Sequence, residues 1–191
     1  MQNYRVLETK YVVIVYGGLA LISLLWDGFS HQNLLWSWFH STWPSYFSLL
    51  MAVLFVLAYI CASRWLPRFF QWSRELEKIF RQILTPLSYF QIFLLALISG
   101  FIEEWFFRGV LLHHFGLMMS SLLFGLGHFI PSPHLWMWGV WAFFFGIVFG
   151  LFYQVTQSLL LVALIHFSIN LILLLLLNHR GHQRPALLGS D

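Results

Sequence analysis

The sequence predicts an all-α integral membrane protein: a bundle of about six transmembrane helices with one amphipathic cytoplasmic or interfacial helix. Of its 191 residues, 60% are hydrophobic and only 9% are charged, whereas soluble domains carry about 25% charged residues. The apolar residues also come in long runs and do not alternate with polar ones, so lipid is the solvent that suits the chain. No internal repeat or flexible linker divides it, and we expect a single membrane domain over residues 1–191.

Six apolar segments approach the length of about 20 residues that a helix needs to cross a bilayer. We predict spanning helices over residues 11–26, 44–61, 87–112, 116–130, 135–153 and 159–177. The third and fourth segments run almost continuously, and their boundary near His113, His114 and Gly116 is the least defined. The first segment follows two basic residues, but no small-residue cleavage site follows it. We therefore expect a retained helix and not a signal peptide.

Positive charge is concentrated in one loop, residues 62–86, which contains Arg64, Arg68, Arg74, Lys78 and Arg81. Residues 27–43 and 154–158 contain no Lys or Arg. The positive-inside rule then places this loop and both termini in the cytoplasm, and we expect a bacterial inner membrane as the location.

The basic loop also has a helical pattern of its own. Basic residues fall largely between apolar residues that recur at helical spacing. The apolar residues are Phe69, Trp72, Leu76, Ile79, Phe80 and Ile83. This pattern predicts either an amphipathic helix on an anionic membrane surface or a short helix packed on the spans. A net charge of only +3 gives no indication of nucleic-acid binding.

Three charged residues interrupt the third apolar segment. Each charge at mid-membrane costs about 2.5–3.5 kcal/mol on insertion scales, so Glu103, Glu104 and Arg108 indicate a function. Glu104 and Arg108 are four residues apart and share a helical face, so we expect them to pair. Glu103 lies about 100° away around the helix and has no partner in this segment. A carboxyl in such a position suits general acid or base chemistry, although an ion pair that only joins helices is the structural alternative.

Two further polar groups occur in otherwise apolar segments. His128 ends the sequence Phe-Gly-Leu-Gly-His, and His166 and Asn170 are four residues apart on one face of the last span. A single buried histidine is more often a packed residue than a catalyst. Two histidines and an asparagine, in a chain that also buries Glu and Arg, favour one shared polar site.

These motifs resemble those of the CPBP family of intramembrane proteases, which includes CAAX prenyl endopeptidases and bacterial Abi-type proteins. The similarity runs over about residues 90–175, and residues 87–178 form the motif-bearing core. The chain matches the family's EExxxR, FxxxH and HxxxN motifs at residues 103–108, 124–128 and 166–170. The resemblance implies that Glu103 and His128 activate a water, that His166 and Asn170 stabilise the oxyanion, and that Glu104 and Arg108 hold geometry or contact substrate.

The resemblance also implies a membrane-anchored or C-terminally sorted protein as substrate, with the bilayer as the other partner. No cofactor is favoured, because the zinc signature His-Glu-x-x-His is absent. Zinc remains the alternative, with Glu103, His128 and His166 as its ligands. A non-enzymatic membrane partner or immunity-type protein is the other alternative, since intramembrane Glu, His and Arg also occur in proton relays. By span counting, the site is expected in the outer half of the bilayer.

Overall fold

The computed structural model describes residues 9–30, 38–42, 45–84, 86–132 and 135–182. Within these ranges the chain is almost entirely helical and has no strand, and five helical stretches are long and apolar enough to cross a membrane. The prediction of an all-α integral membrane protein is confirmed. The elements are α1 (Thr9–Ser30), α3 (Ser45–Phe69), α4 (Gln71–Leu84), α5 (Tyr89–Glu104), the π-helix η1 (Trp105–Leu111), α6 (Leu112–Gly127), α7 (Trp136–Thr156) and α8 (Leu159–His182).

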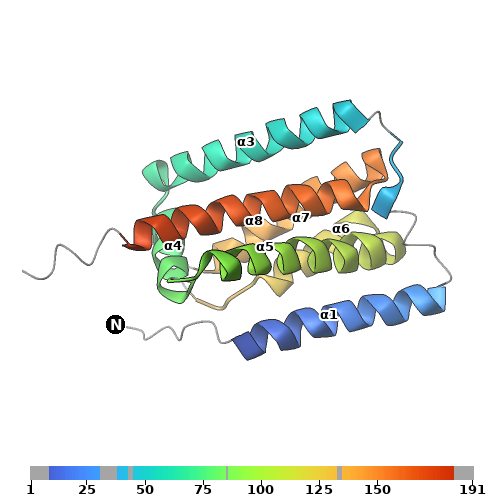
Figure 1. The fold of residues 1–191 in the computed structure, drawn as a ribbon, viewed down its shortest axis with the longest axis horizontal. Helices are drawn as coiled ribbons and strands as arrows, with labels where there is room; N and C mark the ends of the chain where they lie inside the picture. The colour runs from blue at the N-terminus through green and yellow to red at the C-terminus, as the bar shows by residue number, and fades with distance from the viewer. Residues whose placement is uncertain (1–8, 31–37, 43–44, 85, 133–134, 183–191) are drawn as a thin grey trace, which may run out of the picture.

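The long helices lie roughly side by side, with α1 and α3 at opposite edges and α5 and α8 between them (Figure 1). The antiparallel pair of α5 and α8 forms the centre of the bundle. At one end, the Asn178 side chain accepts from the Leu87 backbone amide at 3.1 Å and donates to its carbonyl at 3.0 Å. Towards the other end, Gly100 lies against the backbone of Phe167. This close pairing brings the polar residues of the third and sixth predicted spans together.

Gly116 explains why six predicted spans appear as five long helical stretches. The third stretch runs without interruption from Tyr89 to Gly127, but Gly116 has φ 75° and ψ 174°, which are not helical angles. Such angles are essentially restricted to glycine. The chain reverses there: Ser120 Oγ donates to the Phe107 carbonyl at 2.7 Å, which a straight helix could not allow over 13 residues. The predicted boundary near Gly116 is therefore the turn between two antiparallel arms.

Several predicted spans end at other residues than the helices do: α1, α7 and α8 continue to Ser30, Thr156 and His182, beyond the predicted ends at 26, 153 and 177. The second span was expected to end at Cys61, but α3 continues to Phe69. The fourth was expected to reach Ile130, but α6 ends at Gly127. Hydropathy marks where a helix leaves lipid, whereas the backbone hydrogen bonds can continue beyond that point, as in α3, or stop before it, as in α6. The basic residues Arg5 and Arg184, and the pair 133–134, lie outside the described residues.

The amphipathic segment forms α4, and its aromatic side chains pack on α7. Trp72 lies 6.1 Å from Trp141 and Phe80 lies 4.8 Å from Trp138, measured between ring centroids. Ile79 is buried. Of the two arrangements that the sequence allowed, the described contacts are those of a helix packed against the spans at one end of the bundle (Figure 1).

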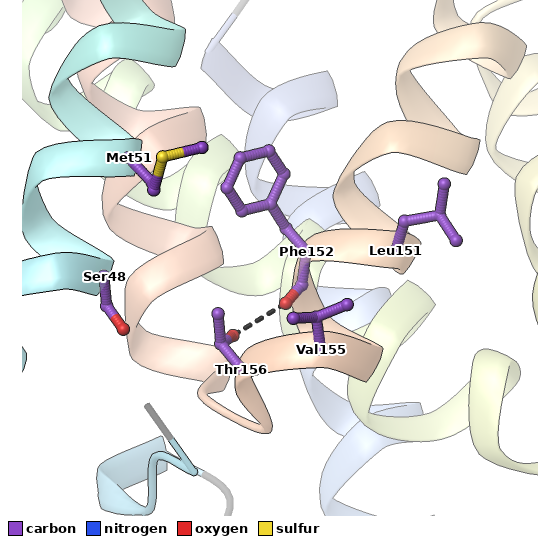
Figure 2. Close-up of a pocket in the computed structure, with 6 residues that line it drawn as sticks. All are labelled: Ser48, Met51, Leu151, Phe152, Val155 and Thr156. Atoms are coloured by element: carbon purple, nitrogen blue, oxygen red, sulfur yellow. Dashed lines mark hydrogen bonds between the residues drawn. The ribbon is translucent and has the colours of Figure 1, made fainter. Parts of the chain in front are cut away.

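A pocket of about 230 Å³ lies between α3 and α7, away from the charged residues. Figure 2 shows Ser48 and Met51 of α3 facing Phe152 and Thr156 of α7. The Thr156 hydroxyl donates to the Phe152 carbonyl at 2.7 Å, and the lining is otherwise largely apolar. This pocket is suited to packing against lipid and contains no acid or base.

Gly100→Ala is expected to destabilise the bundle by about 1–3 kcal/mol, as overpacking typically does. A Cβ atom at this position would lie 2.7 Å from the Phe167 backbone nitrogen and 2.8 Å from its Cα. Since these are backbone atoms, α8 as a whole has to move. Thermal unfolding in detergent would measure the loss. Gly17→Ala is the control, because a Cβ there meets nothing within 4 Å. Equal melting temperatures for the two variants would contradict the packing argument.

Candidate active site

The Glu104–Arg108 ion pair lies at the centre of the site. The predicted pairing is present: Arg108 Nη1 donates to Glu104 Oε1 at 3.0 Å, and the two side chains are 1% and 0% exposed. Arg108 Nη2 also donates to the Gly146 carbonyl at 3.2 Å. The guanidinium lies over the Phe124 ring, with its Cζ 4.5 Å from the ring centroid. A fully buried charge is stable only when it is paired and hydrogen-bonded, and these contacts supply both conditions.

His166 joins this pair from α8. Its Nδ1 lies 2.7 Å from the same Glu104 oxygen that Arg108 contacts. Because a carboxylate oxygen only accepts, Nδ1 carries the proton of this hydrogen bond. The other ring nitrogen, Nε2, is therefore the one that faces the remaining polar groups. Glu104 thus orients two cationic or ionisable side chains from different helices.

Glu103 is held on one oxygen and open on the other. Its Oε1 accepts a hydrogen bond from the Tyr16 hydroxyl of α1 at 2.8 Å. Its Oε2 is buried and has no hydrogen-bond partner among the described residues. That oxygen lies 3.7 Å from His128 Nε2 and 4.0 Å from His166 Nε2. These distances are too long for direct hydrogen bonds, but they leave three polar atoms grouped around one position.

His128 reaches this group from the end of α6. Its Nδ1 lies 2.8 Å from the Phe124 carbonyl, and since a carbonyl only accepts, Nδ1 is the protonated nitrogen. The Phe124 carbonyl sets the tautomer of His128, as the Glu104 carboxylate does for His166, and in both rings Nε2 is directed at Glu103. The aromatic ring of Phe124 packs on the imidazole, with centroids 4.5 Å apart. The FxxxH motif therefore places both residues in the site.

Asn170 lies further from the carboxylates than the other motif residues. Its Nδ2 donates to Ser99 Oγ at 2.8 Å, between α8 and α5. No contact of Asn170 with Glu103 is described. The structure therefore brings Glu103, Glu104, Arg108, His128 and His166 into one cluster, and connects Asn170 to it through a hydroxyl on the same helix as Glu103.

The π-helix η1 begins directly after Glu104. Its wider turn is seen at its end, where the Leu112 amide bonds to the Phe107 carbonyl five residues back. Such segments are rare and often occur at functional sites. Arg108, inside η1, and Glu104, at the end of α5, thus belong to different helical geometries, and both are buried against α7 and α8.

The arrangement was also compared with the needs of zinc. A carboxylate and two imidazoles are suitable ligand types, and each would have to lie about 2.0–2.2 Å from the ion. However, no group of three His, Cys, Asp or Glu side chains within the described residues is arranged to hold a metal ion. The metal-free reaction stays a prediction.

The motif-bearing segment also matches a protein family. Residues 85–172 match the family described as type II CAAX prenyl endopeptidase Rce1-like. We call residues 85–172 the Rce1-like segment, because they are similar to that family. The match confirms the resemblance that the three motifs indicated, and the Rce1-like segment contains Glu103, Glu104, Arg108, His128 and His166. Helices α1 and α3 lie outside it.

A bacterial relative aligns over a longer stretch. The uncharacterized protein YpbD of Bacillus subtilis (strain 168) is 31% identical over 120 residues, which is 63% of this chain and 61% of YpbD. The chain therefore spans less than two thirds of that relative's length. No solved structure matches the chain.

The sequence analysis did not identify two residues that contact the motif residues. Tyr16 and Ser99 both hydrogen-bond to motif residues, yet neither belongs to a motif. The available signal was weak: each is a hydroxyl within an apolar segment, where such groups need a partner. For Ser99, that partner could be sought on the last span. For Tyr16, no local pattern indicates a partner such as Glu103, which lies 87 positions later.

Proposed function

We propose that the chain is an intramembrane endopeptidase that hydrolyses peptide bonds of membrane-anchored substrates with a water activated by Glu103. One observation carries the proposal: the buried Glu103 Oε2, without a partner among the described residues, faces the Nε2 atoms of His128 and His166. A water at this position can donate one hydrogen to Glu103 Oε2 and the other to His128 Nε2, with His166 Nε2 beside it. The Rce1-like family of residues 85–172 supports the same class of reaction.

In the proposed reaction, Glu103 takes a proton from the water as its oxygen attacks the peptide carbonyl. The new C–O bond forms as the carbonyl becomes an oxyanion. The C–N bond then breaks, and Glu103 returns the proton to the leaving amine. His128 orients the water through Nε2. His166, when protonated on both nitrogens, donates from Nε2 to the oxyanion while Glu104 holds its Nδ1.

The ion pair has a positioning role in this scheme. Glu104 and Arg108 are so deeply buried that they hold geometry and do not contact substrate. Their network fixes the His166 ring relative to Glu103, which is the condition that proton transfer in a dry site requires. Asn170 supports the site through Ser99 and retains the role of a weaker oxyanion donor when substrate is bound.

The substrate is proposed to be a protein with a membrane anchor or a C-terminal sorting segment. Glu103 lies about midway between Tyr89, where α5 begins, and Gly116, where the chain reverses. A substrate bond at that depth has to enter from the lipid. With the basic loop and both termini in the cytoplasm of a bacterial cell, the Gly116 turn faces outward, and exported proteins become the substrates.

The test is hydrolysis by the purified full-length chain in liposomes. The probe is a set of synthetic peptides that each carry one apolar anchor, incubated in ¹⁸O-water and analysed by mass spectrometry. Hydrolysis is expected to introduce one ¹⁸O atom into the new carboxyl terminus. Absence of ¹⁸O-labelled products across the set, from protein with a cooperative melting transition, would favour the non-enzymatic membrane partner. Loss of activity with a chelator, and its recovery with zinc, would contradict the metal-free mechanism and support a zinc-dependent one.

A further inference from the structure

Helix α1 packs on the bundle along a narrow stripe that includes Tyr16 and Ser23. Most of its large apolar side chains are exposed to the surroundings: Tyr11, Val13, Ile14, Val15, Leu21, Ile22, Leu24, Leu25 and Phe29. Ser23 is fully buried, and Tyr16, two helical turns earlier on the same face, is half-buried. In lipid, close packing and polar contacts hold helices together, because apolar side chains gain little over their contacts with lipid.

Two side-chain hydrogen bonds join α1 to the reversed α5–α6 hairpin. The Tyr16 hydroxyl donates to Glu103 Oε1 at 2.8 Å, and Trp26 Nε1 donates to His114 Nε2 at 2.6 Å. The second bond lies near the Gly116 turn and touches none of the clustered site residues. The first ends on the carboxylate that the proposed reaction uses. The two bonds therefore offer a matched comparison on one helix.

The Tyr16 bond fixes the orientation of the Glu103 carboxylate plane. The terminal torsion of a glutamate is broad, so an unrestrained carboxylate turns readily about its last bond. With Oε1 engaged by the phenol, Oε2 remains directed towards His128 and His166.

Tyr16 lies outside the Rce1-like segment. Its hydroxyl has one proton, which the hydrogen bond to Glu103 uses. The Ser99 hydroxyl accepts from Asn170 and donates to the Ala96 carbonyl of its own helix. The Tyr16–Glu103 bond is therefore separate from the Asn170–Ser99 bond.

We propose that Tyr16 is a positioning residue of the active site, which holds the Glu103 carboxylate in the orientation that activates water. The inference rests on the proposed function and extends it: α1, although outside the matched segment, completes the site. Tyr16 acts through Glu103 and does not need to contact substrate. Its loss should therefore slow the chemical step and leave substrate binding unchanged.

The test compares Tyr16→Phe with Trp26→Phe in the full-length chain, using an anchored peptide that the wild type cleaves. Tyr16→Phe is expected to lower kcat by about ten- to hundredfold with unchanged KM, the effect of losing a hydrogen bond to a charged group. Trp26→Phe should leave kcat within about twofold. Equal losses in both variants, or a raised KM with unchanged kcat in Tyr16→Phe, would overturn the proposal.

A spectroscopic measurement separates this proposal from the proposed function. Fluorotyrosine placed at position 16 gives a ¹⁹F resonance that reports on its hydrogen-bond partner. Glu103→Gln is expected to shift this resonance, whereas Glu75→Gln on α4 should not. A resonance whose chemical shift is unchanged by Glu103→Gln would overturn the proposal even if the wild type cleaves peptides. A shifted resonance in a protein that cleaves none would instead refute the proposed function and leave the Tyr16–Glu103 pairing supported.

Discussion

Glu103→Gln is expected to abolish peptide hydrolysis and to leave the fold intact. The amide oxygen of glutamine can still accept from Tyr16, so the contact between α1 and α5 survives. The amide cannot take up a proton, however, and general acid–base catalysis alone contributes about 10²–10⁴ in rate. We expect kcat to fall by at least about 10³-fold, while the melting temperature in detergent changes little. Both quantities can be measured on the same purified protein.

Two further substitutions compare how much His128 and Asn170 contribute to the rate of hydrolysis. His128→Ala should be as inactive as Glu103→Gln, because the water loses the group that orients it. Asn170→Ala should retain a low residual activity, since removing one oxyanion donor typically lowers the rate by about 10²–10³-fold. Glu75→Gln is the control, because that carboxylate lies in α4 and pairs with Lys78 at 2.8 Å. Near-normal cleavage by Glu103→Gln would exclude Glu103 as the base.

Arg108→Ala is expected to produce the largest loss of stability. Glu104 is completely buried, and without Arg108 its charge would be balanced only through His166. The Gly146 carbonyl would lose its donor as well. Breaking a buried pair by removing one partner costs about 3–5 kcal/mol, so we expect a strongly lowered melting temperature or no folded protein. Thermal unfolding and recovery from the membrane would measure the effect.

A double substitution keeps this prediction testable if Arg108→Ala does not fold. Glu104→Gln combined with Arg108→Met removes both charges, and it should recover part of the lost stability because no unpaired charge remains. Arg81→Ala is the matched control: its partner Glu77 is 20% exposed, and such pairs contribute about 0–1 kcal/mol. If Arg108→Ala melted like Arg81→Ala, the buried pair would have no structural importance.

The parts of the site that follow from local spacing could be predicted. Glu104 and Arg108 pair because they are four residues apart on one helix, and the high cost of charge in lipid marked both as functional. The convergence of His128 and His166 on Glu103 was expected for the same reason. Spacing along a helix indicates which side chains share a face. In a membrane bundle polar groups are few, so each has few possible hydrogen-bond partners.

The remaining features depend on tertiary contacts that leave no local pattern. Tyr16 pairs with a residue 87 positions away, and a tyrosine in a spanning helix is otherwise ordinary near an interface. The π-helix after Glu104 has an apolar sequence like that of its neighbours. The break near Gly116 was visible as a boundary, but only the fold shows that α6 returns along η1 to bring His128 beside Glu103.

The Gly116 reversal also affects the bilayer around the protein. From Gly116 to Gly127 the returning arm has only 12 residues, about 18 Å at 1.5 Å per residue. A hydrocarbon core is about 30 Å thick. Where a helix is shorter than the core, lipid thins or the flanking chain dips inward, at a modest cost per ångström of mismatch. We therefore expect a locally thin membrane beside His128, which would shorten the path of water to the carboxylate and couple the site to the acyl-chain length of the host lipids.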